Sequence, residues 1–285
     1  MAYYKIAGLN VEFNFKNFTF SNPYLEEYKV DSFDKADISI DFELDNEIYE
    51  KLPNPFVSKN GRHYFETEDS FGFYDHITEV DKTVSVMKTN RSWNSFSYKF
   101  SDLTELFGID VNTTVRNVAG HLFADGIRRF DGAVLHASTI VYDGKAVTFT
   151  APSGTGKSTH TGLWKKFYPE TVIINDDMPA IRCVDDVFNA YGTPWAGKTD
   201  INENTSAPLH AMVFIERAEE CSISPITPME AIIRMMREVP LAVYKEQSDL
   251  LMNFFNKLFT SVPVYLLKCN ISKDAVDVVK NQLFD

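Results

Sequence analysis

Apolar and polar residues alternate along much of the first 110 positions of the chain. Because successive side chains of a β-strand point to opposite faces, this period of two predicts strands. Asn-Pro pairs at 22 and 54 and an Asn-Gly pair at 60 separate these segments as turns. Aromatic residues are dense in this region, which indicates a hydrophobic core rather than a surface that binds a ligand. We therefore predict a β-rich N-terminal domain over residues 1–112, with strands at residues 4–7, 11–15, 38–44, 64–67, 84–87 and 95–100.

The pattern becomes helical near residue 110. Apolar residues then recur at a spacing of three and four as far as Phe130, which places them on one face of a helix. Asn112-Thr113-Thr114 offers the polar cap with which such a helix begins. We place a domain boundary at this change and predict a second domain over residues 113–285.

Strand and helix patterns alternate in the second domain, which is typical of an α/β fold. Tyr142-Asp143-Gly144-Lys145 is a hairpin signal, so the strand at residues 146–151 follows an antiparallel neighbour at residues 133–140. The predicted sheet is therefore mixed. Pro263 interrupts the strand at residues 262–267 and predicts that it lies at a sheet edge. The other strands are predicted at residues 171–175, 179–182 and 209–216, and helices at residues 159–167, from 228 onward, 248–259 and 272–283.

Composition and charge limit the classes of function. The chain has 285 residues, of which 44% are hydrophobic and 24% charged, as in globular proteins with a sizeable core. A net charge of −12 argues against a general nucleic-acid binder or a binder of anionic membranes. The three cysteines lie far apart and predict neither a disulfide framework nor a metal site. Residues 1–9 lack the features of a signal peptide, and we expect the protein in the cytoplasm.

The strand at residues 146–151 leads into a loop that nearly matches the Walker A pattern. Ala151 stands where the first glycine usually sits, and Gly156-Lys157-Ser158 completes the pattern. Glycines let backbone N–H groups point at an anion, and the helix N-terminus adds partial positive charge. A chance turn is the alternative, but the strand before and the helix after favour a phosphate loop. We therefore predict that ATP is bound by Ser153, Gly154, Thr155, Gly156, Lys157, Ser158 and Thr159.

A short apolar run ends in two aspartates one helix after this loop. An apolar strand that ends in aspartate is the Walker B arrangement, which predicts that Asp176 joins the Ser158 hydroxyl as a ligand of Mg²⁺. Asp177 is then available as a base toward a hydroxyl. Adjacent aspartates alone are more often solvated, but their position after the phosphate loop favours the functional interpretation.

A polar loop at residues 189–204 carries a third group of candidates. A Trp with a Lys three residues later could close over a substrate or nucleotide, and the Trp could equally anchor the loop to the body of the domain. The candidates of this substrate loop are Trp195, Gly197 and Lys198.

The hairpin, the phosphate loop and the Asp-Asp strand together resemble the C-terminal domain of the HPr serine kinase/phosphorylase family. More broadly, they are similar to the phosphoenolpyruvate carboxykinase nucleotide-binding fold. The stretches that carry the resemblance are Leu135 to Ser138, Ser153 to Thr159 and Asn175 to Asp177. The chain is also similar to bacterial HPr-kinase-related proteins in the signatures at 157–161, 175–177 and 192–198.

This resemblance implies a mixed-sheet P-loop domain and an ATP- and Mg²⁺-dependent kinase. It adds His136, which lies where the family has a histidine before its hairpin, to Asp177 and Lys157 as catalytic candidates. The partners that it implies are a nucleotide and a hydroxyl acceptor on a protein, a peptide or a small molecule. The related kinases are hexamers, so a homo-oligomer is compatible with it. The net charge adds the expectation of no nucleic acid and no membrane as partners.

Two other functions stay open from the sequence. A carboxykinase-like lyase would need a second metal site and a carboxylate-binding arginine, for which the chain offers Arg217 and Lys198 but no clear set. A non-catalytic nucleotide-binding or partner-binding module would need no base. Five residues together argue against such a module: Lys157, Ser158, Asp176, Asp177 and His136.

Overall fold

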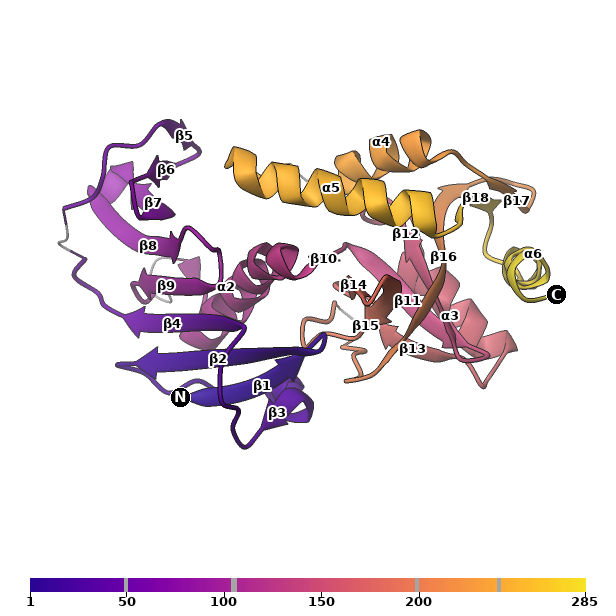
Figure 1. Cartoon of the computed structure of the whole chain (residues 1–285), viewed down its shortest axis with the longest axis horizontal. Helices are drawn as coiled ribbons and strands as arrows, with labels where there is room; N and C mark the ends of the chain where they lie inside the picture. The colour runs from indigo at the N-terminus through magenta and orange to yellow at the C-terminus, as the bar shows by residue number, and fades with distance from the viewer. Residues whose placement is uncertain (49–50, 104–106, 198–199, 240–241) are drawn as a thin grey trace. The chain divides into compact units, whose positions relative to one another are not determined.

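The computed structural model describes residues 1–48, 51–103, 107–197, 200–239 and 242–285. The chain divides into two compact units, Met1–Arg129 and Phe130–Asp285 (Figure 1). The division follows helix α2 (Val111–Gly126), whereas we predicted a boundary after residue 112. Helix α2 lies so close to the first sheet that a Cβ on Gly126 would be 2.9 Å from Ile38 Cδ1. Its apolar face therefore belongs to the core of the first unit.

The first unit is built on a sheet in the order β3-β1-β2-β4-β9-β8-β7-β6-β5. The pairs β2–β4 and β4–β9 are parallel and the others antiparallel. The predicted strands are confirmed, and the Asn60-Gly61 turn joins β5 to β6 with both residues at positive φ. The strands are β1 (Ala2–Ile6), β2 (Leu9–Lys16), β3 (Lys29–Val30), β4 (Ile38–Leu44), β5 (Val57–Lys59), β6 (Arg62–Glu66), β7 (Ser70–Ile77), β8 (Lys82–Asn90) and β9 (Ser95–Phe100), with short 3-10 helices at Pro23–Tyr28, Thr78–Val80 and Ile127–Phe130.

The second unit is a mixed sheet with helices on both faces. Its strands are β10 (Gly132–Val134), β11 (Ala137–Tyr142), β12 (Lys145–Thr150), β13 (Val172–Asn175), β14 (Ala180–Val184), β15 (Val187–Tyr191), β16 (Ser206–Arg217), β17 (Ser222–Pro225) and β18 (Val264–Cys269). Its helices are α3 (Lys157–Phe167), α4 (Pro228–Glu238), α5 (Lys245–Ser261) and α6 (Lys273–Phe284). The sheet order is β10-β14-β15-β16-β12-β11-β13, and β18 pairs with β16 and β17.

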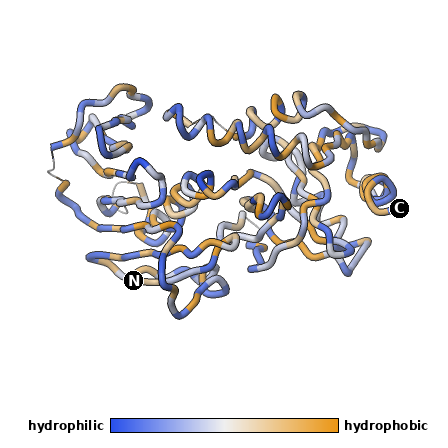
Figure 2. The backbone as a smooth tube through the Cα atoms, viewed as in Figure 1, coloured by the Kyte–Doolittle hydropathy of each residue, from blue (hydrophilic) through white to orange (hydrophobic). Residues whose placement is uncertain are grey.

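Two apolar clusters cover the two faces of this sheet. One includes residues of α4 and α5, such as Met235 and Phe255, and the other includes Trp164 of α3 and Val276 of α6. The mixed α/β character predicted for this part of the chain is confirmed. Figure 2 shows apolar and polar residues interspersed along the helices, and among the described residues no helix is long and apolar enough to span a membrane.

Several predicted boundaries need correction. The cap of α2 is Asp110, which accepts a hydrogen bond from the Thr113 backbone, so the helix begins before residue 112. The apolar run at residues 133–140 forms two strands, β10 and β11, that pair with different neighbours. The prediction of an edge position for residues 262–267 is wrong, because β18 lies between β16 and β17. Pro263 precedes the first paired residue, so its missing N–H costs the ladder nothing.

Candidate functional site

The predicted phosphate loop connects β12 to α3. The hairpin from β11 turns through Asp143 and Gly144, both at positive φ, and brings β12 back antiparallel to β11, as predicted. Gly154 and Gly156 have φ values of 77° and 120°, which favour glycine. A Cβ on Gly154 would meet no other atom within 4 Å, so there is room for a side chain at this position. The positive φ of the backbone, and not a steric clash, is therefore what favours glycine there. Helix α3 then begins at Lys157 and points its N-terminus at the loop.

Lys157 is folded over this loop. Its Nζ donates a hydrogen bond of 2.8 Å to the carbonyl of Ala151, and the residue is only 7% exposed. Burial lowers the pKa of Lys157, while the nearby carboxylates of Glu238 and Asp177 oppose the shift. The ammonium group is therefore held at the loop, where bound phosphates would meet it.

Arg217, at the end of β16, donates two hydrogen bonds to backbone carbonyls of the loop. Its Nε donates to the carbonyl of Thr155 at 3.0 Å, and its Nη2 donates to the carbonyl of Gly154. These bonds hold the carbonyls toward Arg217. The sequence named Arg217 only as a carboxylate-binding candidate. The only sequence feature that could have indicated this contact is the position of Arg217 at the end of a long apolar strand.

A cavity of about 430 Å³ opens over the loop and gathers most of the predicted site. Its size is within the range of small-molecule sites. It brings the acidic pair and His136 to the predicted phosphate loop, although these residues come from three separate segments. The lining residues are His136, Ser153, Gly154, Gly156, Lys157, Ser158, Thr159, Asp176, Asp177 and Gly197. Thr155, the remaining loop residue of the prediction, lines a neighbouring cavity.

Ser158 and Asp176 are the residues here that could hold a magnesium ion. Both line the same cavity, and a hydroxyl and a carboxylate are the hard oxygen donors that Mg²⁺ accepts beside phosphate oxygens. The described residues contain no cluster of three or more His, Cys, Asp or Glu side chains arranged for a metal. A Ser–Asp pair completed by phosphate oxygens needs no such cluster, so the residues present fit the ion.

Backbone pairing places His136 beside Asp177. The N–H groups of Leu135 and Ala137 donate to the carbonyls of Pro179 and Asp177, each at 3.0 Å, on either side of His136. Its Nε2 lies 3.6 Å from Asp177 Oδ1.

The electrostatic surroundings of His136 favour its neutral form. Burial and the charge of Lys157 lower its pKa, and Asp177 and Glu238 act in the opposite direction. Glu238, at the end of α4, is an acidic neighbour of the site that the sequence did not indicate.

Asn175 fixes the turn that carries the two aspartates. Its Oδ1 accepts hydrogen bonds from the backbone of Asp177 at 2.9 Å and of Met178 at 2.7 Å. Its Nδ2 donates to the carbonyls of Thr193 and Trp195. This fully buried amide therefore ties the acidic turn to the loop at residues 193–195.

The described residues of the predicted substrate loop differ in position: one is buried in the interior and one lines the cavity. Trp195 is 3% exposed and lies in the interior, which fits the loop-anchoring alternative that the sequence left open. Gly197 lines the cavity, where a Cβ would lie 3.0 Å from Asp177 Cβ. Lys198 lies outside the described residues.

Comparisons with known proteins place the second unit in a family. A family model described as "SynChlorMet cassette protein ScmC" matches residues 111–284, which is more than half of the chain. Among solved structures, the chain is similar to the Hpr(Ser) kinase/phosphatase from Coxiella burnetii, with 12% identity and a TM-score of 0.33 over 52% of this chain and 89% of that chain. No curated protein matches the chain.

Proposed function

The chain belongs to the ScmC family, and we propose that it is an ATP- and Mg²⁺-dependent kinase that transfers the γ-phosphate to a hydroxyl group. The observation that carries this proposal is the single cavity that holds Lys157, Ser158, the two aspartates and His136. Binding a nucleotide alone requires no base beside the phosphates. The acceptor is a protein, a peptide or a small molecule with a free hydroxyl, and the cytoplasm would supply the ATP.

Each loop group has a defined task in this mechanism. The loop N–H groups and the start of α3 bind the phosphates, and Lys157 exchanges its bond to the Ala151 carbonyl for phosphate oxygens. Ser158 and Asp176 would hold the magnesium ion, which supplies charge neutralisation to the transferring group when bound. The bonds from Arg217 to the loop carbonyls keep the loop in shape before the nucleotide arrives.

Asp177 acts on the acceptor. Its carboxylate takes the hydroxyl proton while the acceptor oxygen forms a bond to the γ-phosphorus. The bond from that phosphorus to the bridging oxygen breaks, and its electron pair stays on ADP. His136 Nε2 lies 3.6 Å from Asp177 Oδ1, so after a small side-chain shift a neutral His136 can donate a hydrogen bond to this carboxylate and orient it toward the acceptor.

The first experiment is calorimetric titration of Mg²⁺-ATP into the wild type and Lys157→Ala. We expect binding in the wild type and its loss in Lys157→Ala. The matched control is Lys166→Ala. Lys166 is an exposed lysine on the same helix, and it lines neither this cavity nor the neighbouring cavity that contains Thr155. This variant should bind Mg²⁺-ATP as the wild type does. Absence of binding to the wild type would contradict the proposal.

Transfer is tested separately with Asp177→Asn. We expect this variant to bind Mg²⁺-ATP nearly as the wild type does, because Asp177 is assigned to the acceptor and not to the nucleotide. Transfer of labelled γ-phosphate to a pool of Ser- and Thr-containing peptides, or to water, should fall by about 10²-fold or more, the low end of what a general base contributes. Full turnover would remove Asp177 from the mechanism. Binding without any transfer by the wild type would instead support a non-catalytic module.

A further inference from the structure

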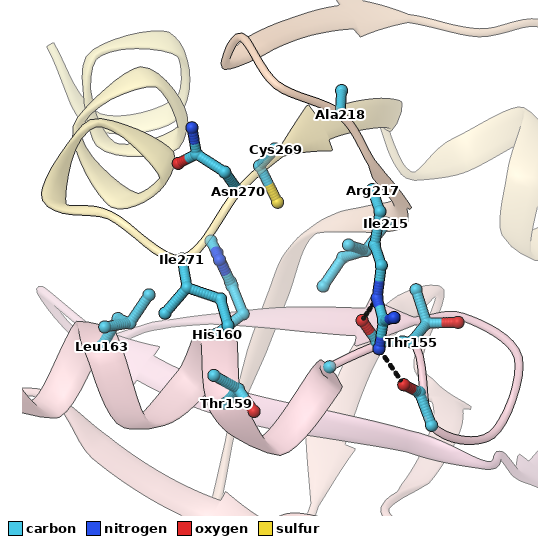
Figure 3. A pocket seen from close by; sticks show the side chains of 12 residues that line it. Thr155, Thr159, His160, Leu163, Ile215, Arg217, Ala218, Cys269, Asn270 and Ile271 are labelled. Atoms are coloured by element: carbon cyan, nitrogen blue, oxygen red, sulfur yellow. Dashed lines mark hydrogen bonds between the residues drawn. The ribbon is translucent and has the colours of Figure 1, made fainter.

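A second cavity of about 440 Å³ lies on the other flank of the phosphate loop. Three segments that are distant in the sequence form it: the start of α3, the end of β16 and the turn between β18 and α6 (Figure 3). The kinase mechanism above uses only the loop and Arg217 from this cavity. The lining residues are Gly154, Thr155, Gly156, Thr159, His160, Leu163, Ile215, Arg217, Ala218, Cys269, Asn270 and Ile271.

The two cavities meet at the phosphate loop. Gly154, Gly156 and Thr159 line both of them. The first cavity contains the acidic pair and therefore the γ-phosphate end of the proposed nucleotide. A phosphate chain that crosses the loop at the shared residues would emerge in the second cavity at its other end. We propose that the second cavity receives the base and ribose of this nucleotide, an inference that rests on the proposed function.

The side chains of this cavity suit the flat, largely apolar faces of a nucleobase. Leu163 and Ile215 contribute apolar surface from α3 and β16. Figure 3 shows Ile271 near Leu163 and His160, with Ile215 on the opposite side of the cavity. Ile271 is 78% exposed, the highest exposure among the large apolar residues described. A base that packs against it would remove this surface from water, which favours binding.

The upper wall of the cavity is fixed before a ligand binds. Asn270 donates through Nδ2 to the carbonyl of Glu219 at 2.6 Å, and its Oδ1 accepts a bond of 3.4 Å from Cys221 Sγ. Ser272 caps α6 directly after Ile271. Because both neighbours of Ile271 are held, its backbone need not be ordered on binding, which lowers the entropic cost.

A comparison of two ligands separates the base from the phosphates. Mg²⁺-ATP and Mg²⁺-tripolyphosphate share the phosphate chain, and only ATP has a nucleoside. We expect the wild type to bind ATP at least tenfold more tightly than tripolyphosphate. Ile271→Ala should weaken ATP binding about tenfold, or about 1.4 kcal/mol, as expected for about two methyl-sized groups no longer buried, and should leave tripolyphosphate binding unchanged.

Ile233→Ala is the matched control. Ile233 is an exposed isoleucine on α4 that lines neither cavity, so its truncation should leave both affinities unchanged. Equal affinities of the wild type for ATP and tripolyphosphate would overturn the inference and leave the phosphate site standing. Equal weakening of both ligands by Ile271→Ala would also overturn it, because the residue would then act only on the loop. Failure of both ligands to bind the wild type would overturn the proposed function itself.

Discussion

His160 makes the second unit sensitive to acid. It lies on the first turns of α3, is 3% exposed and packs against Phe149, with their ring centroids 4.6 Å apart. The indole N–H of Trp164 donates to its Nε2 at 3.2 Å. An accepting Nε2 requires the neutral imidazole with its proton on Nδ1. Burial lowers the pKa of His160 to about 3, far below its ordinary value of 6.5.

The size of the effect follows from these two pKa values. Between pH 6.5 and 3 the unfolded chain binds a proton at this position and the folded chain does not, so stability falls as the pH falls. At 1.36 kcal/mol per pH unit, lowering the pH from 7 to 4 removes about 3 kcal/mol of the free energy of unfolding. Above pH 6.5 both states are neutral at His160, and the residue contributes no pH dependence.

The assay compares the wild type with His160→Gln by urea unfolding at pH 7, 5.5 and 4. A glutamine side-chain oxygen can still accept the bond from Trp164 but cannot take up a proton. We expect the variant to be about 1–2 kcal/mol less stable at pH 7 through lost packing, and the wild type to lose about 3 kcal/mol more than the variant by pH 4. Replacing the exposed His121 in the same way serves as the control for a histidine-to-glutamine change outside this buried site.

Parallel pH profiles of the wild type and His160→Gln would refute the reasoning. A nitrogen NMR titration of the imidazole gives an independent check at the residue itself. The His160 ring should stay neutral, with its proton on Nδ1, down to pH 4 while the protein remains folded. Protonation of the ring near pH 6 in the folded protein would contradict the assignment.

Two further variants test how the loop and the base are positioned. In Gly197→Ala, the new Cβ would lie 3.0 Å from Asp177 Cβ and 3.1 Å from Asp177 Cγ and would displace this carboxylate. We therefore expect kcat for phosphoryl transfer to fall about tenfold, with unchanged binding of Mg²⁺-ATP by calorimetry. Weaker ATP binding would contradict this expectation. The Arg217→Gln variant loses at least one of the two hydrogen bonds to the loop carbonyls. It should bind Mg²⁺-ATP about tenfold more weakly, which corresponds to a net loss of about 1–2 kcal/mol. Unchanged affinity would show that these hydrogen bonds do not keep the loop in its binding conformation.

Local chemistry made part of this site predictable from the sequence. The phosphate loop and the Asp143-Gly144 hairpin are contiguous patterns whose backbone requirements are visible in their residue types. The hairpin of β14 and β15 gave no comparable signal, because its turn uses Asp185 and Asp186 at positive φ without a glycine. Aspartate tolerates this conformation, but it is also common in ordinary loops, so its presence does not identify the turn.

Long-range contacts could not be predicted in this way. Arg217 is 62 residues from its bonding partner Thr155, and Glu238 comes from a helix whose sequence shows only a capped amphipathic pattern. A single polar residue at a strand or helix end is usually solvated, so its chemistry becomes visible only when the fold supplies its neighbours.

The proximity of His136 to Asp177 is a consequence of the strand order of the second unit. Strand β13 pairs with β11 and not with the loop strand β12, so β11 separates the phosphate loop strand from the strand that carries the aspartates. The register of this pair sets Thr139 opposite Asn175, and the continued pairing of Ala137 with Asp177 sets His136 at the break before β11. A strand parallel to β13 would instead bring its C-terminal end to Asp177, so the antiparallel pairing is what sets the start of β11 there. The β11–β12 hairpin therefore brings both the predicted phosphate loop and His136 to the end of β13 that carries Asp177.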